Sequence, residues 1–276
     1  MLCTSGVAWT DGGQRHWRRD RPAPARAPVW DRDALRDPHG QPDKAARVEA
    51  MFDAIAPTYE LVNTLGSLGR DAAWRRRAVA AAGAGAGEIV LDICCGTGDM
   101  LRALAQATPP PALLVGVDFA GQMLARANFA AVRVPVHVIR ADALRLPLAD
   151  DTVDAVTCAF GVRNFADVPR GLAEMHRVTR PGGRVVILEF ALPEHPVWRV
   201  FHRLYVGRFL PLLAAMVNRD RIGAYRYLAR SIRMFEPARE LARRLEAAGF
   251  RQVTWRTMNF GGVVLYRGVK PPTDAG

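Results

Sequence analysis

The residues best suited to chemistry lie where an apolar run containing Asp92 breaks into a turn with Gly96 and Gly98. The pattern predicts a buried strand, a tight turn and then a helix. Glycines in the turn permit backbone conformations that a side chain would forbid, and they let a ligand approach the main chain closely. Such a turn is typical of a nucleotide-type cofactor site, although the same turn also occurs as a plain connector.

Two further carboxylates, Asp118 and Asp142, follow the next two predicted strands. In open α/β sheets, ligands bind outside the carboxyl ends of the strands. Asp118 lies 20 residues after Gly98, which is the spacing at which a carboxylate accepts hydrogen bonds from ribose hydroxyls. The three strand ends therefore predict one site for a ribose-bearing ligand.

The turn departs from the dinucleotide-binding pattern in two ways. Met100 and Leu101 occupy the region where a third glycine should seat a pyrophosphate. Asp99, at the start of the following helix, would repel a phosphate. These departures favour a cofactor with a ribose and a positive centre but no phosphate, namely S-adenosylmethionine.

Strands and helices alternate from residue 88 onward, which predicts an α/β fold with a mostly parallel sheet and helices on both faces. The last two strands are expected to form an antiparallel hairpin at the sheet edge. The predicted strands are 89–93, 113–117, 134–139, 153–158, 184–190, 253–258 and 263–267, with 181–183 as a turn. The predicted helices of this part are 100–107, 122–129, 168–178 and 238–247.

The remaining segments are assigned by composition. Residues 1–42 are rich in Arg, Asp, Pro and Gly and are expected to be a disordered leader, whose acidic residues argue against a transit peptide. A single domain is then expected over 43–270. It comprises a helical cap (43–87, with helices from residue 44 to Pro57 and over 72–81), a cofactor-binding core (88–190), a helical substrate- or membrane-facing insertion (191–236) and a closing helix with strands (237–270). Residues 271–276 are a tail.

Charge and cysteine content limit the class of protein. The net charge of +11 is concentrated in residues 199–256, which carry 13 basic and 4 acidic side chains. One basic face suggests an anionic partner, although a solvated arginine-rich surface would look the same. The chain has neither a run of 18 apolar residues nor an apolar N-terminal segment, so a cytoplasmic protein is expected. The four cysteines have no metal-ligand spacing and are expected to be reduced, with no metal site.

Three stretches together resemble the UbiE/MenG quinone-biosynthesis C-methyltransferases, a group of class I S-adenosylmethionine-dependent enzymes. They are Phe52-Asp-Ala-Ile-Ala-Pro-Thr-Tyr59-Glu-Leu-Val-Asn63 with Ser67 and Trp74, Phe160-Gly-Val-Arg163-Asn164-Phe, and Arg177-Val-Thr-Arg-Pro-Gly-Gly183 through Leu188-Glu-Phe190. The resemblance covers about residues 48–270. It implies a Rossmann-like fold with a seven-stranded sheet.

The resemblance also implies roles for individual residues. Thr97 would contact the cofactor at the turn, Asp118 its ribose, and Asp142 with Ala143 its adenine. Ala159 stands at a further cofactor-contacting strand end, where some relatives carry Ser. The full expected cofactor set is Asp92, Gly96, Thr97, Gly98, Asp118, Phe119, Asp142, Ala143 and Ala159.

Two positions depart from the family pattern. Glu60 stands where the family usually has Asp, and Arg70-Asp71 stands where a His is common. A catalytic role for that His therefore cannot be transferred to this chain.

The substrate implied by the resemblance is a polyprenylated quinol. Demethylmenaquinol is favoured over the 2-methoxy-6-polyprenyl-1,4-benzoquinol of ubiquinone biosynthesis, because Cys94-Cys95 and residues 174–179 resemble the menaquinone-side members more. Residues 197–217 are apolar and aromatic, punctuated by Arg199, Arg203 and Arg208. They could cover a prenyl tail and rest on the anionic inner face of the membrane, or simply pack as a lid. A homodimer is left open.

Ring methylation requires alignment of donor and acceptor, together with stabilisation of a phenolate. Arg163 is the candidate for phenolate stabilisation, with Asn164, Tyr59 and Asn63 orienting the ring. The alternative for Arg163 is a salt bridge that shapes its loop, and Glu189 is either a base or a structural acid. An RNA methyltransferase would also explain the basic block, but the chain has no Asn/Asp-Pro-Pro-Tyr/Phe-type motif and no appended nucleic-acid module, so no nucleic acid is expected as partner.

Overall fold

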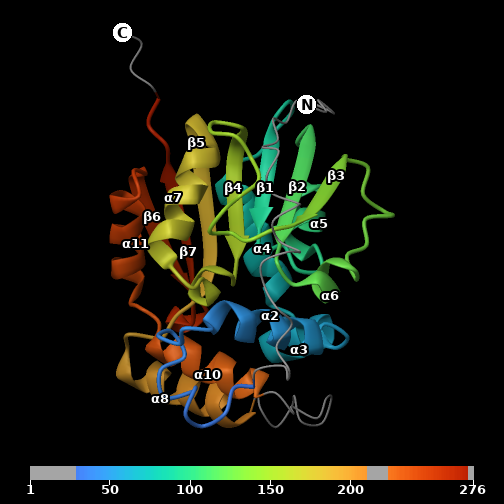
Figure 1. Ribbon diagram of the computed structural model, residues 1–276. Coiled ribbons are helices and arrows are strands. Elements are labelled where there is room, and N and C mark those ends of the chain that lie inside the picture. The colour runs from blue at the N-terminus through green and yellow to red at the C-terminus, as the bar shows by residue number, and fades with distance from the viewer. Residues whose placement is uncertain (1–28, 210–222, 273–276) are drawn as a thin grey trace.

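A computed structural model describes residues 29–209 and 223–272. Its centre is one seven-stranded sheet with the order β3-β2-β1-β4-β5-β7-β6 (Figure 1). The strands are β1 (Ile89–Ile93), β2 (Leu113–Asp118), β3 (Val136–Arg140), β4 (Val153–Ala159), β5 (Thr179–Phe190), β6 (Arg251–Met258) and β7 (Val263–Val269). Strands β1 to β5 run parallel to one another, whereas β7 is antiparallel to β5 and β6 is antiparallel to β7. The predicted fold class and edge hairpin are confirmed.

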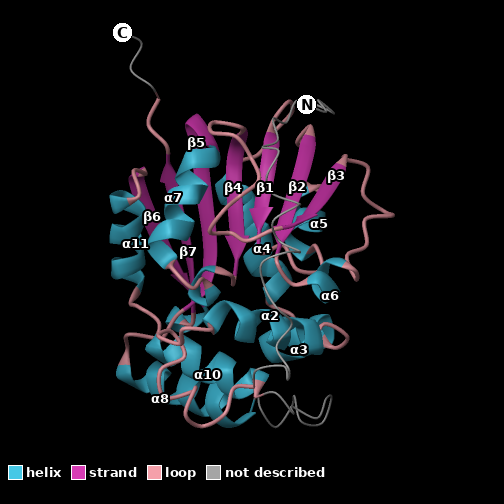
Figure 2. Cartoon of the chain, in the orientation of Figure 1, coloured by secondary structure: helices cyan, strands magenta, loops and turns pink. Residues whose placement is uncertain are grey.

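Helices lie on both faces of the sheet and across the carboxyl ends of its parallel strands (Figure 2). The flanking helices are α4 (Asp71–Ala82), α5 (Asp99–Leu104), α6 (Gly121–Leu124), α7 (Val168–Val178) and α11 (Ala238–Ala247). The helical layer beyond the strand ends consists of α2 (Lys44–Ile55), α3 (Tyr59–Ser67), α8 (Pro196–Leu204), which continues as a π-helical turn over Tyr205–Phe209, and α10 (Ala224–Met234). Short 3-10 turns follow β4 at Val162–Asn164 and β6 at Asn259–Gly261.

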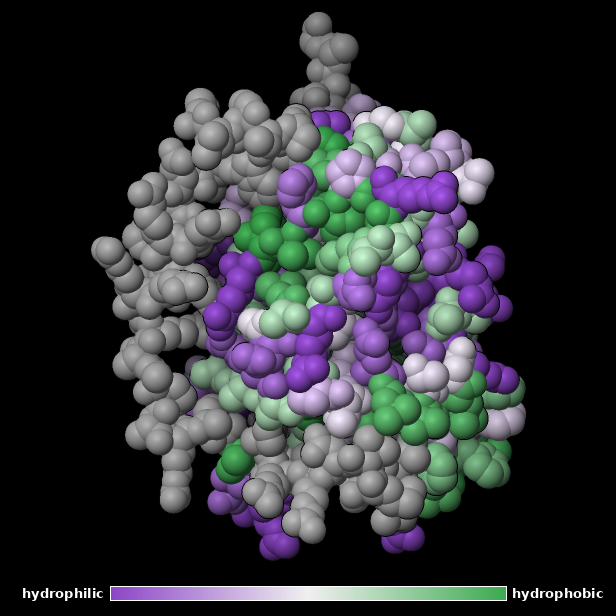
Figure 3. Space-filling view, turned by 90° about the vertical axis from the view of Figure 1, so that its right-hand side faces the viewer, coloured by the Kyte–Doolittle hydropathy of each residue, from purple (hydrophilic) through white to green (hydrophobic). Residues whose placement is uncertain are grey.

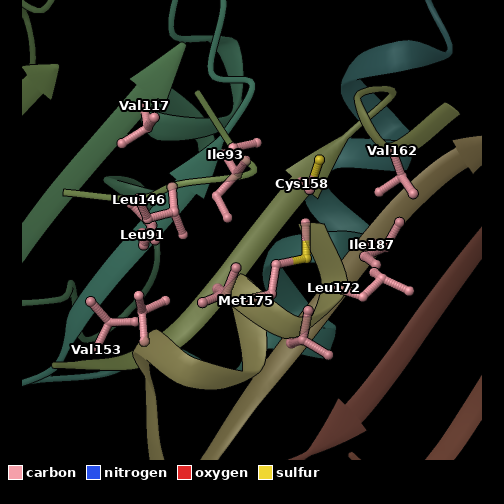
Figure 4. Packing of buried hydrophobic residues seen from close by; sticks show 14 of the residues in the cluster. Leu91, Ile93, Val117, Leu146, Val153, Cys158, Val162, Leu172, Met175 and Ile187 are labelled. Atoms are coloured by element: carbon pink, nitrogen blue, oxygen red, sulfur yellow. The ribbon is translucent and has the colours of Figure 1, made fainter. Parts of the chain in front are cut away.

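The core forms because side chains alternate across strands that are covered on both faces. All five residues of β1 are buried. Leu91 and Ile93 pack toward Leu172 and Met175 of α7 (Figure 4), whereas Val90 packs with the α4 and α5 residues on the opposite face. This near-continuous apolar pattern is what a parallel strand under two helical layers requires. The rigid core fixes where each strand ends, and therefore where the polar residues after it lie.

A second cluster holds the helical layer together and includes part of the predicted leader. Trp30 is fully buried, and its ring stacks on that of Tyr227 in α10 at a centroid distance of 4.1 Å. The start of the packed chain expected at residue 43 is therefore too late, because residues 29–42 include a large aromatic side chain with a partner. The rest of the leader, residues 1–28, lies outside the described residues, as do residues 210–222 of the apolar basic segment.

Two local predictions are corrected. The helix expected over 122–129 is only the single turn α6, after which the Arg126 and Ala127 amides donate to the carbonyls three residues before them and form tight turns instead of continuing the helix. The turn at 181–183 lies inside β5 instead of preceding it. There the ladder with β4 shifts register after Val153, and Gly182 adopts a left-handed φ of +79°.

Candidate active site

A strand-end pocket of about 360 Å³ lies where β1, β2 and β4 end. This is the switch point of the sheet, since β2 and β4 lie on opposite sides of β1. Its lining residues are Phe52, Tyr59, Cys94, Gly96, Asp118, Phe119, Met123, Ala159, Phe160, Gly161 and Asn164. Four of the expected cofactor residues therefore face one hollow: Gly96, Asp118, Phe119 and Ala159.

The glycine turn leaves room for a ligand. Gly96 and Gly98 have left-handed φ angles of +56° and +89°, which a side chain would strain. A Cβ at Gly96 would meet no atom within 4 Å, whereas one at Gly98 would overlap the Phe129 ring at 2.6 Å. Between them, the hydroxyl of Thr97 is buried with no hydrogen-bond partner among the described residues. An open cradle beside an unpartnered hydroxyl fits a bound polar ligand.

Asp118 is the carboxylate of the strand-end pocket. Its Oδ2 accepts from the Gly96 amide at 2.9 Å and its Oδ1 from the Ala120 amide at 2.8 Å. Burial raises the pKa of Asp118 to about 6, although the backbone amides oppose this shift. Each oxygen keeps acceptor capacity for a hydroxyl, so the residues present fit the ribose of S-adenosylmethionine.

Asp92 lies in β1, before the turn, and is not part of the pocket lining. It accepts from the Thr157 hydroxyl at 2.7 Å, and burial raises its pKa to about 7. Asp142 and Ala143 also lie outside the lining residues, and the Asp142 carboxylate accepts from the Leu144 amide at 2.9 Å. The structure thus brings Asp118 to the pocket but leaves Asp142 bound to its own loop.

A helical cavity of about 1090 Å³ lies beside the strand-end pocket, between the helical layer and the sheet. Its lining is mainly apolar and aromatic, and it comes from segments far apart in the sequence. The residues used below are Phe52, Tyr59, Asn63, Ser67, Asp71, Trp74, Arg75, Phe160, Arg163, Phe190, His202, Tyr205, Val206, Leu228 and Ile232. A hollow with this lining suits a mainly apolar ligand that carries a few polar groups.

The two hollows share a wall. Phe52, Tyr59 and Phe160 line both of them. Phe160 has a left-handed φ of +59°, and its carbonyl accepts from the side chains of Arg163 and Asn164. Strain at a non-glycine residue held in place by its surroundings is typical of functional sites. Ligands in the two hollows would meet at these three side chains.

Arg163 is buried and paired with Glu189. Its Nη1 lies 2.8 Å from Glu189 Oε1, and its backbone amide donates to Glu189 Oε2 at 3.1 Å. The same guanidinium lies 5.4 Å from the centroid of the Phe190 ring. Its Nε–H is buried and has no hydrogen-bond partner among the described residues. The geometry therefore contains both expected features, a loop-shaping ion pair and a free donor on a residue that lines the helical cavity.

The other expected catalytic residues divide between the two hollows. Tyr59 lines both and hydrogen-bonds to Asn63, and burial raises the pKa of the Tyr59 hydroxyl above its ordinary value. Asn164 lines only the strand-end pocket; its Oδ1 accepts from the Tyr227 hydroxyl at 2.9 Å and its Nδ2 donates to the Phe160 carbonyl. Asn164 thus supports the shared wall from the strand-end side.

Two buried basic residues at the site, Lys44 and Arg75, were not predicted as site residues. Lys44 supports the site from outside the cavity lining: its buried ammonium donates to the carbonyls of Arg163 and Phe165, which ties the start of α2 to the Arg163 loop. Arg75 is buried and lines the cavity, with Asp71 at 2.5 Å and Asp99 at 2.8 Å. The spacing of Asp71 and Arg75, one helical turn apart beside Trp74, is the signal that could have indicated them.

The surface of the helical layer exposes apolar side chains. None of the nine residues of α8 is buried, and Trp198 stacks on Phe260 at 4.1 Å. Figure 3, which views the molecule from the side away from the α8 label of Figure 1, shows further hydrophobic patches among hydrophilic surface, in its upper part and at its lower right. The half-exposed or exposed apolar residues of α8 and its neighbours are Val197, Trp198, Val200, Phe201, Leu204, Phe209 and Phe260. Among residues 29–209 and 223–272, no helix has the length and hydropathy needed to cross a bilayer.

The family model and the relatives found by sequence agree on one family. The model of the ubiE/COQ5 methyltransferase family matches residues 41–270. A demethylmenaquinone methyltransferase of Mycobacterium sp. (strain KMS) is 45% identical over 227 residues, covering 82% of this chain and 94% of the relative. The ubiquinone/menaquinone biosynthesis C-methyltransferase UbiE of Geobacter sulfurreducens is 39% identical over 234 residues, covering 83% and 90%. The solved [4+2]-cyclase SpnF has a TM-score of 0.60 at 17% identity, covering 82% of this chain and 96% of that one, which shows a shared fold alone.

Proposed function

The chain belongs to the ubiE/COQ5 methyltransferase family, and we propose that it transfers a methyl group from S-adenosylmethionine to a ring carbon of demethylmenaquinol. The observation that carries this proposal is the wall of Phe52, Tyr59 and Phe160 between the strand-end pocket and the helical cavity. The polar strand-end pocket suits the methyl donor, and the mainly apolar helical cavity suits a prenylated ring as methyl acceptor. The two ligands would meet at the shared wall.

The strand-end pocket holds the cofactor in this proposal. Asp118 accepts from the ribose hydroxyls, Thr97 contributes its unpartnered hydroxyl, and the open face of Gly96 admits the ligand to the main chain. Asp92 joins β1 to β4 through the Thr157 hydroxyl, just before the turn. When bound, S-adenosylmethionine supplies a methyl group already activated by its sulfonium.

The helical cavity holds the quinol ring at the shared wall. Ionisation of a quinol hydroxyl raises the electron density on the adjacent ring carbon, and such hydroxyls titrate near pH 10 by analogy with tyrosine. The free Nε–H of Arg163 stabilises the resulting oxide, while Tyr59 and Asn63 orient the ring. Asn164 acts through Phe160, whose carbonyl it holds. Apolar residues farther along the cavity, such as Val206, Leu228 and Ile232, cover the prenyl tail.

An anionic membrane surface supplies the substrate in this proposal. The exposed apolar residues of α8 lie among Arg199, Arg203 and Arg208, a combination typical of interfacial helices. Co-sedimentation with phosphatidylglycerol vesicles tests this: Phe201→Asp should reduce binding, and phosphatidylcholine vesicles should bind less protein. Equal binding to both lipids, unaffected by Phe201→Asp, would contradict membrane docking. Homodimer formation stays a prediction for light scattering to test.

The quinone class is tested in a strain that lacks the gene. Mass spectrometry of its lipid-extracted quinones should show demethylmenaquinone in place of menaquinone, with recovery on complementation. The name of the Geobacter relative includes ubiquinone biosynthesis, so the alternative is methylation of 2-methoxy-6-polyprenyl-1,4-benzoquinol. Accumulation of that precursor would favour the alternative, and unchanged quinones would contradict both.

A further inference from the structure

One wall of the helical cavity carries a polar strip. Tyr59, Asn63 and Ser67 recur every fourth residue on one face of α3, and Asp71 and Arg75 continue the strip on α4. All five line the cavity, whose other walls are largely apolar. A ring with polar substituents that enters the cavity will therefore direct those substituents toward this strip.

Asp71 is the acceptor of the strip. Its Oδ1 accepts from the Ser67 hydroxyl at 2.9 Å and its Oδ2 from Arg75 Nη1 at 2.5 Å. Burial raises the pKa of Asp71, but the hydrogen bonds from Arg75 and Ser67 outweigh burial and leave the pKa below its ordinary value. The side chain is 13% exposed. Asp71 is therefore an ionised carboxylate that retains contact with the cavity.

Among the described lining residues, Asp71 is the one carboxylate, and when ionised it can only accept hydrogen bonds. Arg75 and Arg163 can only donate, and the tyrosine, serine, asparagine and histidine side chains can do either. An ionised carboxylate with two oxygens has about four acceptor sites, and the two side-chain bonds leave capacity for a further donor. A complementary ligand therefore has a hydrogen-bond donor at Asp71 and a hydrogen-bond acceptor at Arg163.

The reduced and oxidised forms of a quinone differ in whether their oxygens can donate a hydrogen bond. A quinol hydroxyl can donate to Asp71 while the second hydroxyl accepts from Arg163 Nε. A quinone has two carbonyl oxygens, both of which can only accept, so one of them would face the carboxylate unpaired. We propose that Asp71 is a specificity-determining residue that selects the reduced quinol over the oxidised quinone. This inference rests on the proposed function.

Such selection has a chemical purpose. Only the quinol has a ring carbon rich enough in electrons to attack a methyl sulfonium, so a bound quinone would block the cavity without reacting. A binding site made for a hydroxyl donor rejects the analogue that lacks it, because a buried polar group is left unpaired. Asp71 therefore keeps the cavity free for the form that can be methylated.

The test compares both redox forms of one ligand. A 2-prenyl-1,4-naphthoquinone and its dithionite-reduced quinol are titrated anaerobically into the full-length protein, and methyl transfer to the quinol is measured with the quinone as competitor. The wild-type protein should bind the quinol about 10- to 100-fold more tightly than the quinone, the range expected for a hydrogen bond to a charged group. In Asp71→Asn, whose amide can donate to a carbonyl, this ratio should fall to about 1–3.

Asp99→Asn is the matched control. It removes the other carboxylate of Arg75, but Asp99 does not line the cavity, so the quinol-to-quinone ratio should stay at its wild-type value. Equal binding of both forms by the wild-type protein would overturn the proposal without any variant. A ratio unchanged in folded Asp71→Asn, or lost equally in Asp99→Asn, would overturn it as well. Failure to methylate the quinol while both forms still bind would instead count against the proposed function.

Discussion

The strand-end pocket and the helical cavity are adjacent but are built in different ways. The pocket follows three strands whose positions the sheet fixes, and its carboxylate Asp118 is held by two backbone amides. The cavity is built by residues from α2, α3, α4, α10, α8 with its π-helical turn, the ends of β4 and β5, and the connection between β6 and β7. Its charged groups are held by one another, as in the pairs Arg163–Glu189 and Arg75–Asp71. The comparison teaches that backbone amides hold the charged group of the strand-end pocket, the proposed cofactor site, whereas packing and ion pairs hold those of the helical cavity, the proposed quinol site.

The largest effect is expected from breaking the buried pair in the cavity wall. Arg163→Ala leaves the Glu189 carboxylate buried without its partner, and such a loss costs about 3–5 kcal/mol of folding free energy. Urea denaturation followed by circular dichroism measures this. A loss below about 1 kcal/mol would show that the pair does not hold the loop.

The double variant Arg163→Met/Glu189→Gln separates structure from chemistry. It removes both charges while Gln keeps an acceptor for the backbone amide of residue 163, so most of the stability should return. Cofactor affinity should match that of the wild-type protein, but methyl transfer should fall by about 100-fold or more, the scale for loss of a donor to developing charge. If methyl transfer recovers together with stability, the role of Arg163 is to hold the structure and not to take part in the reaction.

The second effect concerns the pocket. Asp118→Ala should weaken binding of S-adenosylmethionine by about 1.5–3 kcal/mol, the scale of charge-assisted hydrogen bonds. Isothermal titration calorimetry measures the affinity, and Asp142→Ala is the comparison because its carboxylate is bonded to its own loop. A greater loss of cofactor affinity in Asp142→Ala than in Asp118→Ala would show that Asp118 is not the residue that binds the ribose.

A smaller effect follows from the pKa of Asp118, which burial raises to about 6. The carboxylate gains a proton as the pH falls through that value and then offers fewer acceptor sites, so cofactor affinity should be full above pH 7 and decline below pH 6. Asp118→Asn should bind weakly with little pH dependence. Asp92 has a pKa of about 7 and is the rival source of the effect. If Asp92→Asn, rather than Asp118→Asn, abolishes the pH dependence, the assignment is wrong.

The smallest effect is expected at the shared wall. Tyr59→Phe keeps the ring that lines both hollows but removes the hydroxyl bonded to Asn63. Neutral hydrogen bonds of this kind contribute about 0.5–1.5 kcal/mol, so kcat/KM for the quinol should fall by roughly 2- to 12-fold with cofactor affinity unchanged. Tyr59→Ala should cost more, since it removes the wall itself. Equal effects of Phe and Ala would assign the role to the hydroxyl alone.

The two regions also differ in how far the sequence predicts them. Asp118 could be placed because strand ends and a fixed spacing determine it, and α7 and α11 agree with prediction to the residue. The burial of Trp30 could not be predicted, because nothing local in residues 29–42 shows that its partner is Tyr227, almost 200 positions away. The Arg163–Glu189 pair joins two strand ends across 26 residues in the same way. Helices and strands follow from patterns within a short stretch of sequence and can be predicted. Side-chain contacts between residues far apart in the sequence cannot be predicted in this way.

In the proposed function, the two hollows hold a methyl donor and a prenylated quinol on either side of one wall. Its most direct test is a single reaction that contains the purified protein, S-adenosylmethionine labelled in the methyl group, a 2-prenyl-1,4-naphthoquinol and total RNA. The account predicts label in the solvent-extracted naphthoquinol, on the ring carbon beside the prenyl group. Label in the RNA, or no transfer to the quinol when calorimetry shows that the cofactor is bound, would contradict it.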